Sequence, residues 1–145
     1  MMAQNNHFRK LENMYLTAPC NEFYEPKIKV RKGAAEITIP IREEFFHAAG
    51  ATHGSVYFKA MDEAAFFAVN SLIKDTFVLT VNFNVQLIRP IVTGKMKAVG
   101  KVLYNSNKYY FAESIVYDSE NREIAHGTGN YVKSAIPLTP EIGYK

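Results

Sequence analysis

The chain of 145 residues is 48% hydrophobic, which is enough for one folded domain whose core needs neither disulfides nor a metal. Its 17 basic and 14 acidic residues are scattered and give a net charge of +3, so the sequence lacks the basic arm that is typical of nucleic-acid binding. The single cysteine, Cys20, excludes an intramolecular disulfide, and the lack of a signal-peptide core or a membrane-spanning apolar run favours a cytoplasmic protein that does not bind membranes.

The first 20 residues are expected to form a helical segment. Four apolar residues recur there at helical spacing: Phe8, Leu11, Met14 and Tyr15. They predict a short amphipathic helix over about 7–16 that ends before Pro19. From Pro26 onward, isoleucine and valine alternate with polar residues on both sides of Lys32-Gly33. This alternation predicts an opening pair of strands over about 26–41.

A long helix is predicted over about 54–72, where apolar residues occupy nearly every side. Only three charged residues interrupt it: Lys59, Asp62 and Glu63. A helix that is apolar all round is buried, so we expect the rest of the chain to enclose it.

The second half of the chain is predicted to be an antiparallel meander. β-rich runs over 76–88, 95–104, 108–117 and 122–132 are separated by short turn-forming segments that leave no room for crossover helices. Residues 134–145 are expected to be an irregular tail. The predicted fold is therefore α+β, one domain over 1–145 in which a curved antiparallel sheet wraps around one long helix.

The chemistry is expected near the start of the central helix. A helix N-terminus offers unpaired N–H groups to a developing oxyanion, and an acid within the helix can act as a base or a nucleophile. Asp62 and Glu63 are both candidates: Glu63 can pair with Lys59 four residues earlier, and Asp62 can pair with it at a distance of three. The family spacing described below decides for Asp62. Asp62 is also expected to need a buried partner or a raised pKa, because little of this helix faces solvent.

The segment from His47 to Asp62 resembles the hotdog-fold acyl-CoA thioesterases, in particular the phenylacetate-degradation type. The family pattern is Asn-x-x-Gly-x-x-His-Gly-Gly, followed by an Asp nine residues after the His. This chain matches it with Gly50, His53, Gly54 and Asp62, whereas His47 replaces the Asn and Ser55 replaces the second Gly. The resemblance extends from about Ile37 to Val132.

The resemblance implies hydrolysis of an acyl-CoA to a free acid and CoA. Asp62 would activate water or attack directly, the Gly54 N–H would polarise the carbonyl, His47 would orient water or the carbonyl, and Thr80 would bind Asp62 or the water. Gly50, His53 and Ser55 would border the substrate. No metal and no cofactor besides the substrate's own CoA are implied.

The spacing of the site predicts an assembly. Gly54 and Asp62 are eight residues apart, or roughly 12 Å along a helix, so they cannot both reach one thioester carbon within a subunit. A facing subunit would complete each site, which agrees with the composite sites of the family and predicts a homodimer or a dimer of dimers.

Two other functions fit the same pattern. A hotdog hydratase or dehydratase would use His47 with Asp62, although the Pro-containing turn of those relatives is absent. A non-catalytic module would bind acyl-CoA in the same groove. Outside the pattern, His7 and His126 are expected to be surface or sheet residues, and Gly127 and Gly129 to permit close backbone approach.

Overall fold

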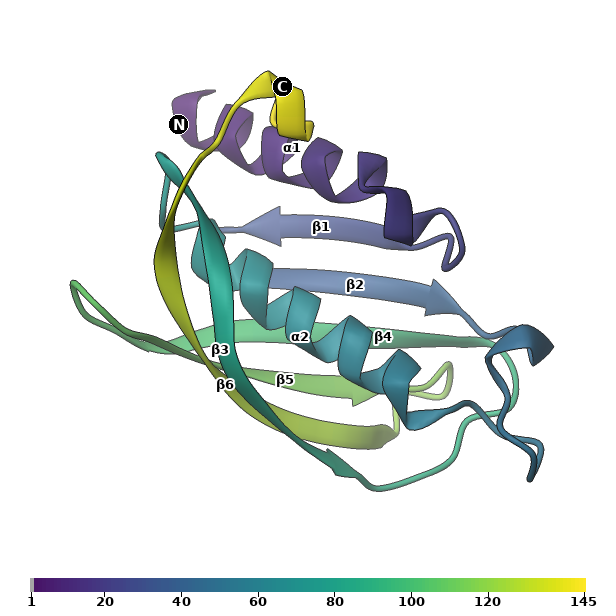
Figure 1. Cartoon of the computed structure of the whole chain (residues 1–145). Coiled ribbons are helices and arrows are strands. Elements are labelled where there is room, and N and C mark those ends of the chain that lie inside the picture. Colours follow the sequence, from purple (N-terminus) through teal and green to yellow (C-terminus); the bar gives the residue numbers. More distant parts are fainter. Residues whose placement is uncertain (1) are drawn as a thin grey trace.

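The computed structural model describes residues 2–145, which form two α-helices, three short 3-10 helices (Pro19–Asn21, Glu43–Phe45 and Pro140–Ile142) and a single sheet (Figure 1). The α-helices are α1 (Met2–Thr17) and α2 (Gly54–Asn70), and the strands are β1 (Lys27–Arg31), β2 (Ala34–Pro40), β3 (Thr76–Leu87), β4 (Lys95–Asn105), β5 (Tyr110–Tyr117) and β6 (Glu123–Pro137). The strands pair antiparallel in the order β1-β2-β4-β5-β6-β3, and the sheet curves around α2. The predicted α+β architecture is confirmed.

The predicted element boundaries differ from the structure mainly at the two ends of the chain. Helix α1 begins at Met2 rather than near His7. Strand β6 continues to Pro137, so residues 134–137 are not part of an irregular tail as predicted. The reason is that β3 provides a partner for β6 from Ala125 as far as the Thr76–Pro137 pair, and a proline is tolerated where a strand ends.

Helix α2 is enclosed by the concave face of the sheet, as its composition predicts. All residues from Ala64 to Asn70 are buried. Small side chains allow the helix to lie close to the strands: a Cβ on Gly100 of β4 would come within 2.3 Å of the Ala64 carbonyl. Gly127 and Gly129 of β6 have the predicted close contacts, in both cases with Phe83 and the β3 backbone. No helix within residues 2–145 is long and apolar enough to cross a membrane.

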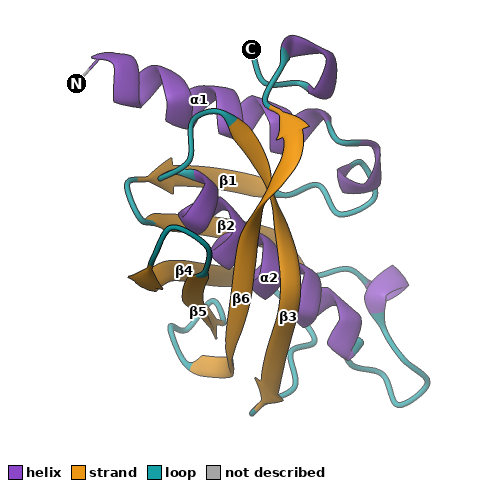
Figure 2. Cartoon of the chain, turned by 60° about the vertical axis from the view of Figure 1, so that its left-hand side comes forward, coloured by secondary structure: helices purple, strands orange, loops and turns teal. Residues whose placement is uncertain are grey.

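The N-terminal helix and the C-terminal residues cover the end of α2. Figure 1 shows both chain ends beside α1, and Figure 2 shows β3 and β6 crossing α2 as a long pair. His7 is buried, so its predicted surface or sheet position is wrong: Nε2 lies 3.0 Å from the Asn70 carbonyl and Nδ1 lies 2.6 Å from the Tyr144 hydroxyl. These contacts join α1, α2 and the C-terminus.

Candidate active site

Asp62 lies half-buried in the middle of α2, where the helix faces β3 and β6. The Thr80 hydroxyl donates a hydrogen bond of 2.9 Å to Asp62 Oδ1. The Tyr131 hydroxyl lies 3.0 Å from the same carboxylate oxygen and 3.1 Å from the Asp62 carbonyl. The expected contact of Thr80 with Asp62 is therefore present, and Tyr131 is a partner that the sequence analysis did not identify.

The register of the sheet explains why two hydroxyls meet one oxygen. Thr80 on β3 and Tyr131 on β6 are directly paired residues, and opposite residues of an antiparallel pair project from the same face. The register shifts just after this pair, between Thr80 and Asn82, as expected for a β-bulge. Bulges re-aim side chains and are frequent near active sites.

The environment of Asp62 has two effects: burial disfavours ionisation of the carboxyl group, and two hydroxyl groups fix its orientation. Burial raises the pKa of the Asp62 carboxyl above its usual range, while the hydrogen bonds from Thr80 and Tyr131 and the charge of Lys59 lower it again. Burial and the neighbouring Asp62 carboxylate also raise the pKa of Tyr131, which therefore remains a protonated donor. Perturbed acids of this kind are typical of functional sites.

Glu63 forms the expected pair with Lys59. The Lys59 ammonium contacts Glu63 Oε1, donates a hydrogen bond of 2.6 Å to Asn21 Oδ1, and lies 4.7 Å from the centre of the Tyr24 ring. Burial raises the pKa of Glu63, and the Lys59 charge opposes this shift. The two adjacent acids thus differ in their partners, hydroxyls for Asp62 and a cation for Glu63.

A cavity of about 400 Å³ adjoins both acids. Its walls are largely apolar and come from α1, α2, β3 and the C-terminal turn, and its polar lining includes Asp62, Thr80, Glu63, Asn21 and Tyr15. Three phenylalanines contribute to the walls: Phe66, Phe67 and Phe77. The volume falls within the range of about 300–1,000 Å³ that is usual for small-molecule sites.

The N-terminus of α2 lies at a different place. His53 is its N-cap, and the His53 Nδ1 accepts a hydrogen bond of 3.0 Å from the Ser55 N–H. Gly54 is the first helical residue, so its N–H has no acceptor within the helix. Gly50 in the preceding turn has a φ of 83°, a left-handed conformation that favours glycine.

A second cavity of about 280 Å³ lies beside this N-terminus and is lined by His47, Gly54 and the loop that follows β3. His47 is exposed, and its Nδ1 accepts a hydrogen bond of 3.1 Å from the Ala49 N–H. Thr52 anchors the turn through a hydrogen bond of 2.8 Å to the Ile91 carbonyl. The turn is thus held against the loop after β3.

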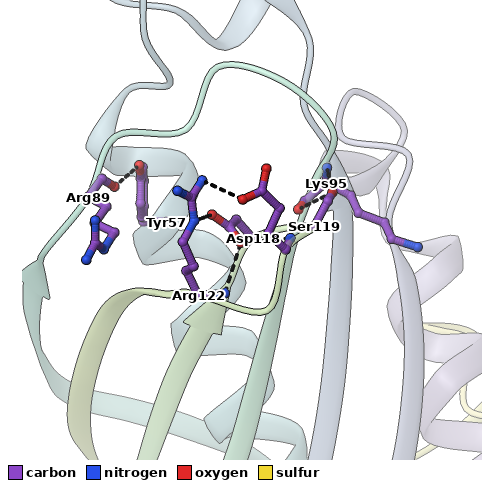
Figure 3. Close-up of polar contacts among 7 residues, drawn as sticks. Tyr57, Arg89, Lys95, Asp118, Ser119 and Arg122 are labelled. Carbon is purple, nitrogen blue, oxygen red and sulfur yellow. Dashed lines mark hydrogen bonds and ion pairs between the residues drawn. The ribbon is translucent and has the colours of Figure 1, made fainter.

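Polar contacts hold that loop in place (Figure 3). The Tyr57 hydroxyl of α2 donates a hydrogen bond of 2.8 Å to the Arg89 carbonyl. On the neighbouring turn, the Arg122 guanidinium pairs with Asp118 at 2.8 Å and with Glu120 at 3.5 Å. Arg89 does not take part in any ion pair of residues 2–145, so its guanidinium is available at the rim of the second cavity.

The predicted site residues therefore fall into two groups within one chain. Asp62 and Thr80 share the first cavity with Tyr131 nearby, whereas His47 and Gly54 line the second, close to Gly50, His53 and Ser55. Residues 2–145 contain no cluster of three His, Cys, Asp or Glu side chains suited to a metal.

Comparison with protein families identifies the chain. Residues 49–125, which include the turn, α2 and most of the meander, match the family described as the thioesterase superfamily. The chain belongs to the thioesterase superfamily. This membership supports a hydrolase that acts on thioesters, and the fold is the hotdog fold that the resemblance implied.

Individual relatives agree with this assignment. A protein of Sulfurisphaera tokodaii named "Putative esterase" is 28% identical over 102 residues, which cover 70% of this chain and 75% of that protein. The structure of the Escherichia coli PaaI protein from the phenylacetic acid degradation operon superposes with a TM-score of 0.85 at 17% identity, over 94% of this chain and 99% of that one. The structure of a thioesterase family protein from Silicibacter pomeroyi superposes with a TM-score of 0.80 at 21% identity, over 86% of this chain and 95% of that one. At these identities the two structures show a common fold.

Proposed function

We propose that the protein hydrolyses an acyl-CoA thioester and that Asp62 is its catalytic carboxylate. The observation that carries the proposal is a half-buried carboxyl group with a raised pKa, fixed by two hydroxyl donors, at the edge of an apolar cavity. The cavity offers the acyl group an apolar environment, and the carboxylate is held where a reacting carbonyl carbon would enter.

The Gly54 N–H of a facing subunit would complete the site. Within one chain Gly54 and Asp62 border different cavities, so a single subunit supplies the carboxylate and the N–H donor at separate places. In a two-fold dimer the N-terminus of one α2 would lie opposite Asp62 of the other.

The proposed reaction begins when Asp62 accepts a proton from water as the water oxygen attacks the thioester carbon. The carbonyl oxygen becomes an oxyanion and accepts a hydrogen bond from the Gly54 N–H. The tetrahedral intermediate then collapses, the carbon–sulfur bond breaks, and the proton passes to the leaving thiolate. If Asp62 attacks the thioester carbon directly instead, the carbon–sulfur bond breaks, CoA leaves as the thiolate and a mixed anhydride forms. Water then cleaves the anhydride, which restores the Asp62 carboxylate, releases the acid and supplies the proton that the thiolate takes up. Thr80 and Tyr131 hold the carboxylate in either route.

The remaining residues have supporting roles in this proposal. His47 borders the second cavity with Gly54 and would orient water or the carbonyl there. Gly50 and His53 shape the turn, and Ser55 closes it through its bonds to His53. Arg89 at the cavity rim is suited to a phosphate of CoA.

The first test replaces the carboxylate. Asp62→Asn should reduce the rate of CoA release by about 10³-fold or more, because an amide can neither accept the proton nor attack. The control is Asp75→Asn, the same chemical change at an exposed position after α2, which should keep full activity. The measurement is thiol release from short, long and aromatic acyl-CoAs, with dimer content recorded for each protein.

The alternatives give different results in the same assay. Undiminished hydrolysis in Asp62→Asn would remove Asp62 from the reaction. No hydrolysis by the natural protein, with tight acyl-CoA binding, would indicate a binding module. Hydration of an enoyl-CoA that is lost in His47→Gln would indicate the hydratase reaction instead.

A further inference from the structure

A nearly buried lysine beside the first cavity forms contacts that the proposed reaction does not use. The Lys59 side chain is only 12% exposed, and it does not belong to the lining of the cavity. Its ammonium contacts Glu63 Oε1 and donates a hydrogen bond of 2.6 Å to Asn21 Oδ1. The ring centres of Tyr15 and Tyr24 lie 5.7 Å and 4.7 Å from the same ammonium. Lys59 therefore joins α2 to the end of α1 and to the 3-10 helix that follows it.

The segment that Lys59 reaches is one wall of the first cavity. Five lining residues belong to this segment: Met14, Tyr15, Ala18, Cys20 and Asn21. Residues 14–21 are called the N-terminal wall below. The wall precedes residue 49, where the match to the thioesterase superfamily begins, so this side of the cavity comes from outside the matched residues.

The N-terminal wall is held in place at its Asn21 end by the contact with Lys59. Asn21 is 3% exposed, and its Nδ2 donates a hydrogen bond of 2.6 Å to the Tyr15 carbonyl, which ties the two ends of the wall together. The preceding turns of α1 have a separate attachment, in which Glu12 accepts a hydrogen bond of 2.8 Å from the Val30 N–H of β1. Loss of the Lys59 contact would thus release the wall without detaching the rest of α1.

An acyl group that extends from Asp62 along the cavity would pass beneath this wall. Phe66 and Phe67 line the cavity one helical turn beyond Asp62, or roughly 6 Å along α2. The Tyr15 and Phe67 rings meet edge to face with 5.3 Å between their centres, so the wall covers this part of the cavity. An acetyl group would stay beside Asp62, whereas a longer acyl group would contact the wall.

The chemistry of the Lys59 contacts suits a role in positioning. The cost of removing two charges from water offsets much of the attraction within a buried ion pair, so such a pair adds little stability. Its hydrogen bonds nevertheless require definite positions of the partner atoms. Lys59, held by Glu63 on its own helix, therefore fixes where Asn21 lies.

We propose that Lys59 is a positioning residue that acts through Asn21: it holds the N-terminal wall against α2 and thereby increases the affinity for acyl groups long enough to reach the wall. This inference rests on the proposed function for the place of the acyl group beside Asp62. The recognition itself requires only binding and can be measured without turnover.

The test compares the affinities for a short and a longer acyl group. The probes are ketone analogues of acetyl-CoA and hexanoyl-CoA, in which a methylene group separates the sulfur from the carbonyl and prevents hydrolysis. Calorimetric titration gives the ratio of the hexanoyl to the acetyl affinity, and urea unfolding checks that each protein is folded. Lys59→Met should lower this ratio at least about fivefold, because the wall is no longer held in place before the ligand binds.

Further variants assign the effect to the contact between Lys59 and Asn21. Asn21→Ala removes the same contact but keeps the Lys59–Glu63 pair, so it stays informative if an unpaired Glu63 unfolds Lys59→Met. Because both variants act through one contact, the double variant should lower the ratio no further than the more affected single variant. Lys27→Met, the same change at an exposed position of β1, is the control and should leave the ratio within about 1.5-fold.

Two results would overturn the inference: a ratio that stays at the natural value in Asn21→Ala and in any folded Lys59→Met protein, or separate effects of the two variants that multiply in the double variant. Failure of the proposed function would differ from either. In that case the ratio would still fall in the variants, but the natural protein would release no CoA from acetyl-CoA or hexanoyl-CoA.

Discussion

At the scale of single residues, the reactivity of Asp62 depends on whether its carboxyl group is protonated. Burial disfavours its carboxylate form, and the two hydroxyl donors favour it. Only the carboxylate can accept a proton or attack, so the rate should fall as the pH drops through the raised pKa of Asp62. The acid limb of the rate profile thus reports directly on this hydrogen-bonded group.

Removing either hydroxyl donor should shift that limb in a predictable direction. Thr80→Val and Tyr131→Phe each delete a hydrogen bond that stabilises the carboxylate, so the pKa of Asp62 should rise further and activity should be lost at a higher pH. The acid limb should therefore lie at higher pH in both variants than in the natural protein.

Thr80→Ser is the matched control, because it keeps the hydroxyl and should keep the natural profile. The measurement is kcat/KM against pH for one acyl-CoA. If the acid limb of kcat/KM lies at the same pH in Thr80→Val, in Tyr131→Phe and in the natural protein, the titrating group is not Asp62.

The sequence reveals some of these residues and not others. Asp62, Gly54 and Thr80 could be named because they lie within or just after a local spacing pattern, and Lys59 with Glu63 because helix neighbours at four residues meet. Tyr131 could not be named, since it lies 69 positions from Asp62 and meets it only through the β3–β6 register. Alternation along β6 indicates that Tyr131 faces inward but not which helical residue it contacts.

At the scale of elements, the fold depends on how closely α2 approaches β4. Gly100 faces the Ala64–Ala65 backbone, and its missing side chain leaves the space for the helix. Gly100→Ala would put a methyl group 2.3 Å from the Ala64 carbonyl, so the helix or the strand would have to move.

This substitution should lower the free energy of unfolding by about 1–3 kcal/mol, the usual cost of overpacking a core. The control is Lys101→Ala, at an exposed position of the same strand, which should change stability by no more than about 0.5 kcal/mol. Urea unfolding followed by circular dichroism measures both. An unchanged midpoint for Gly100→Ala would mean that the helix and β4 are less tightly packed than described.

The elements themselves were largely predictable, because periodicity of 3.6 or 2 residues is a local property. Their ends were not, because these depend on partners elsewhere in the chain. β6 extends beyond Val132 since β3 provides a partner up to Thr76. His7 is buried because its ring nitrogens contact the Asn70 carbonyl and the Tyr144 hydroxyl, two groups that are distant from it in the sequence.

At the scale of the whole molecule, β3 is an edge strand that exposes several apolar side chains. It pairs only with β6, and its outer edge is free in a single chain. Exposed apolar residues lie along β3 and just after it: Leu79, Val81, Leu87 and Ile88. On α2, Phe58 is 43% exposed and lies one helical turn before Asp62. Long apolar edges are usually covered, which favours pairing with a second copy and agrees with the proposed composite site.

The two halves of the proposed site can be inactivated separately. Gly54→Pro removes the N–H at the first helical position, where proline is tolerated, and the extended conformation of His53 (φ −62°, ψ 143°) suits a residue before proline. Gly54→Ala keeps the N–H and adds the same Cβ, which would lie 3.0 Å from the flexible end of Leu87. It is therefore the matched control and should retain most of the activity.

Mixing subunits then tests whether the site is shared. Asp62→Asn and Gly54→Pro proteins should each be inactive alone, but a mixed dimer would contain one site with the natural Asp62 of one subunit and the natural Gly54 of the other. Random exchange makes half of the dimers mixed, each with one of two sites intact, so activity should return to about one quarter of the natural value. Thiol release measured before and after subunit exchange decides the point. If mixed dimers form and remain inactive, each subunit carries its own complete site, and the carboxylate and the N–H donor do not act together across an interface.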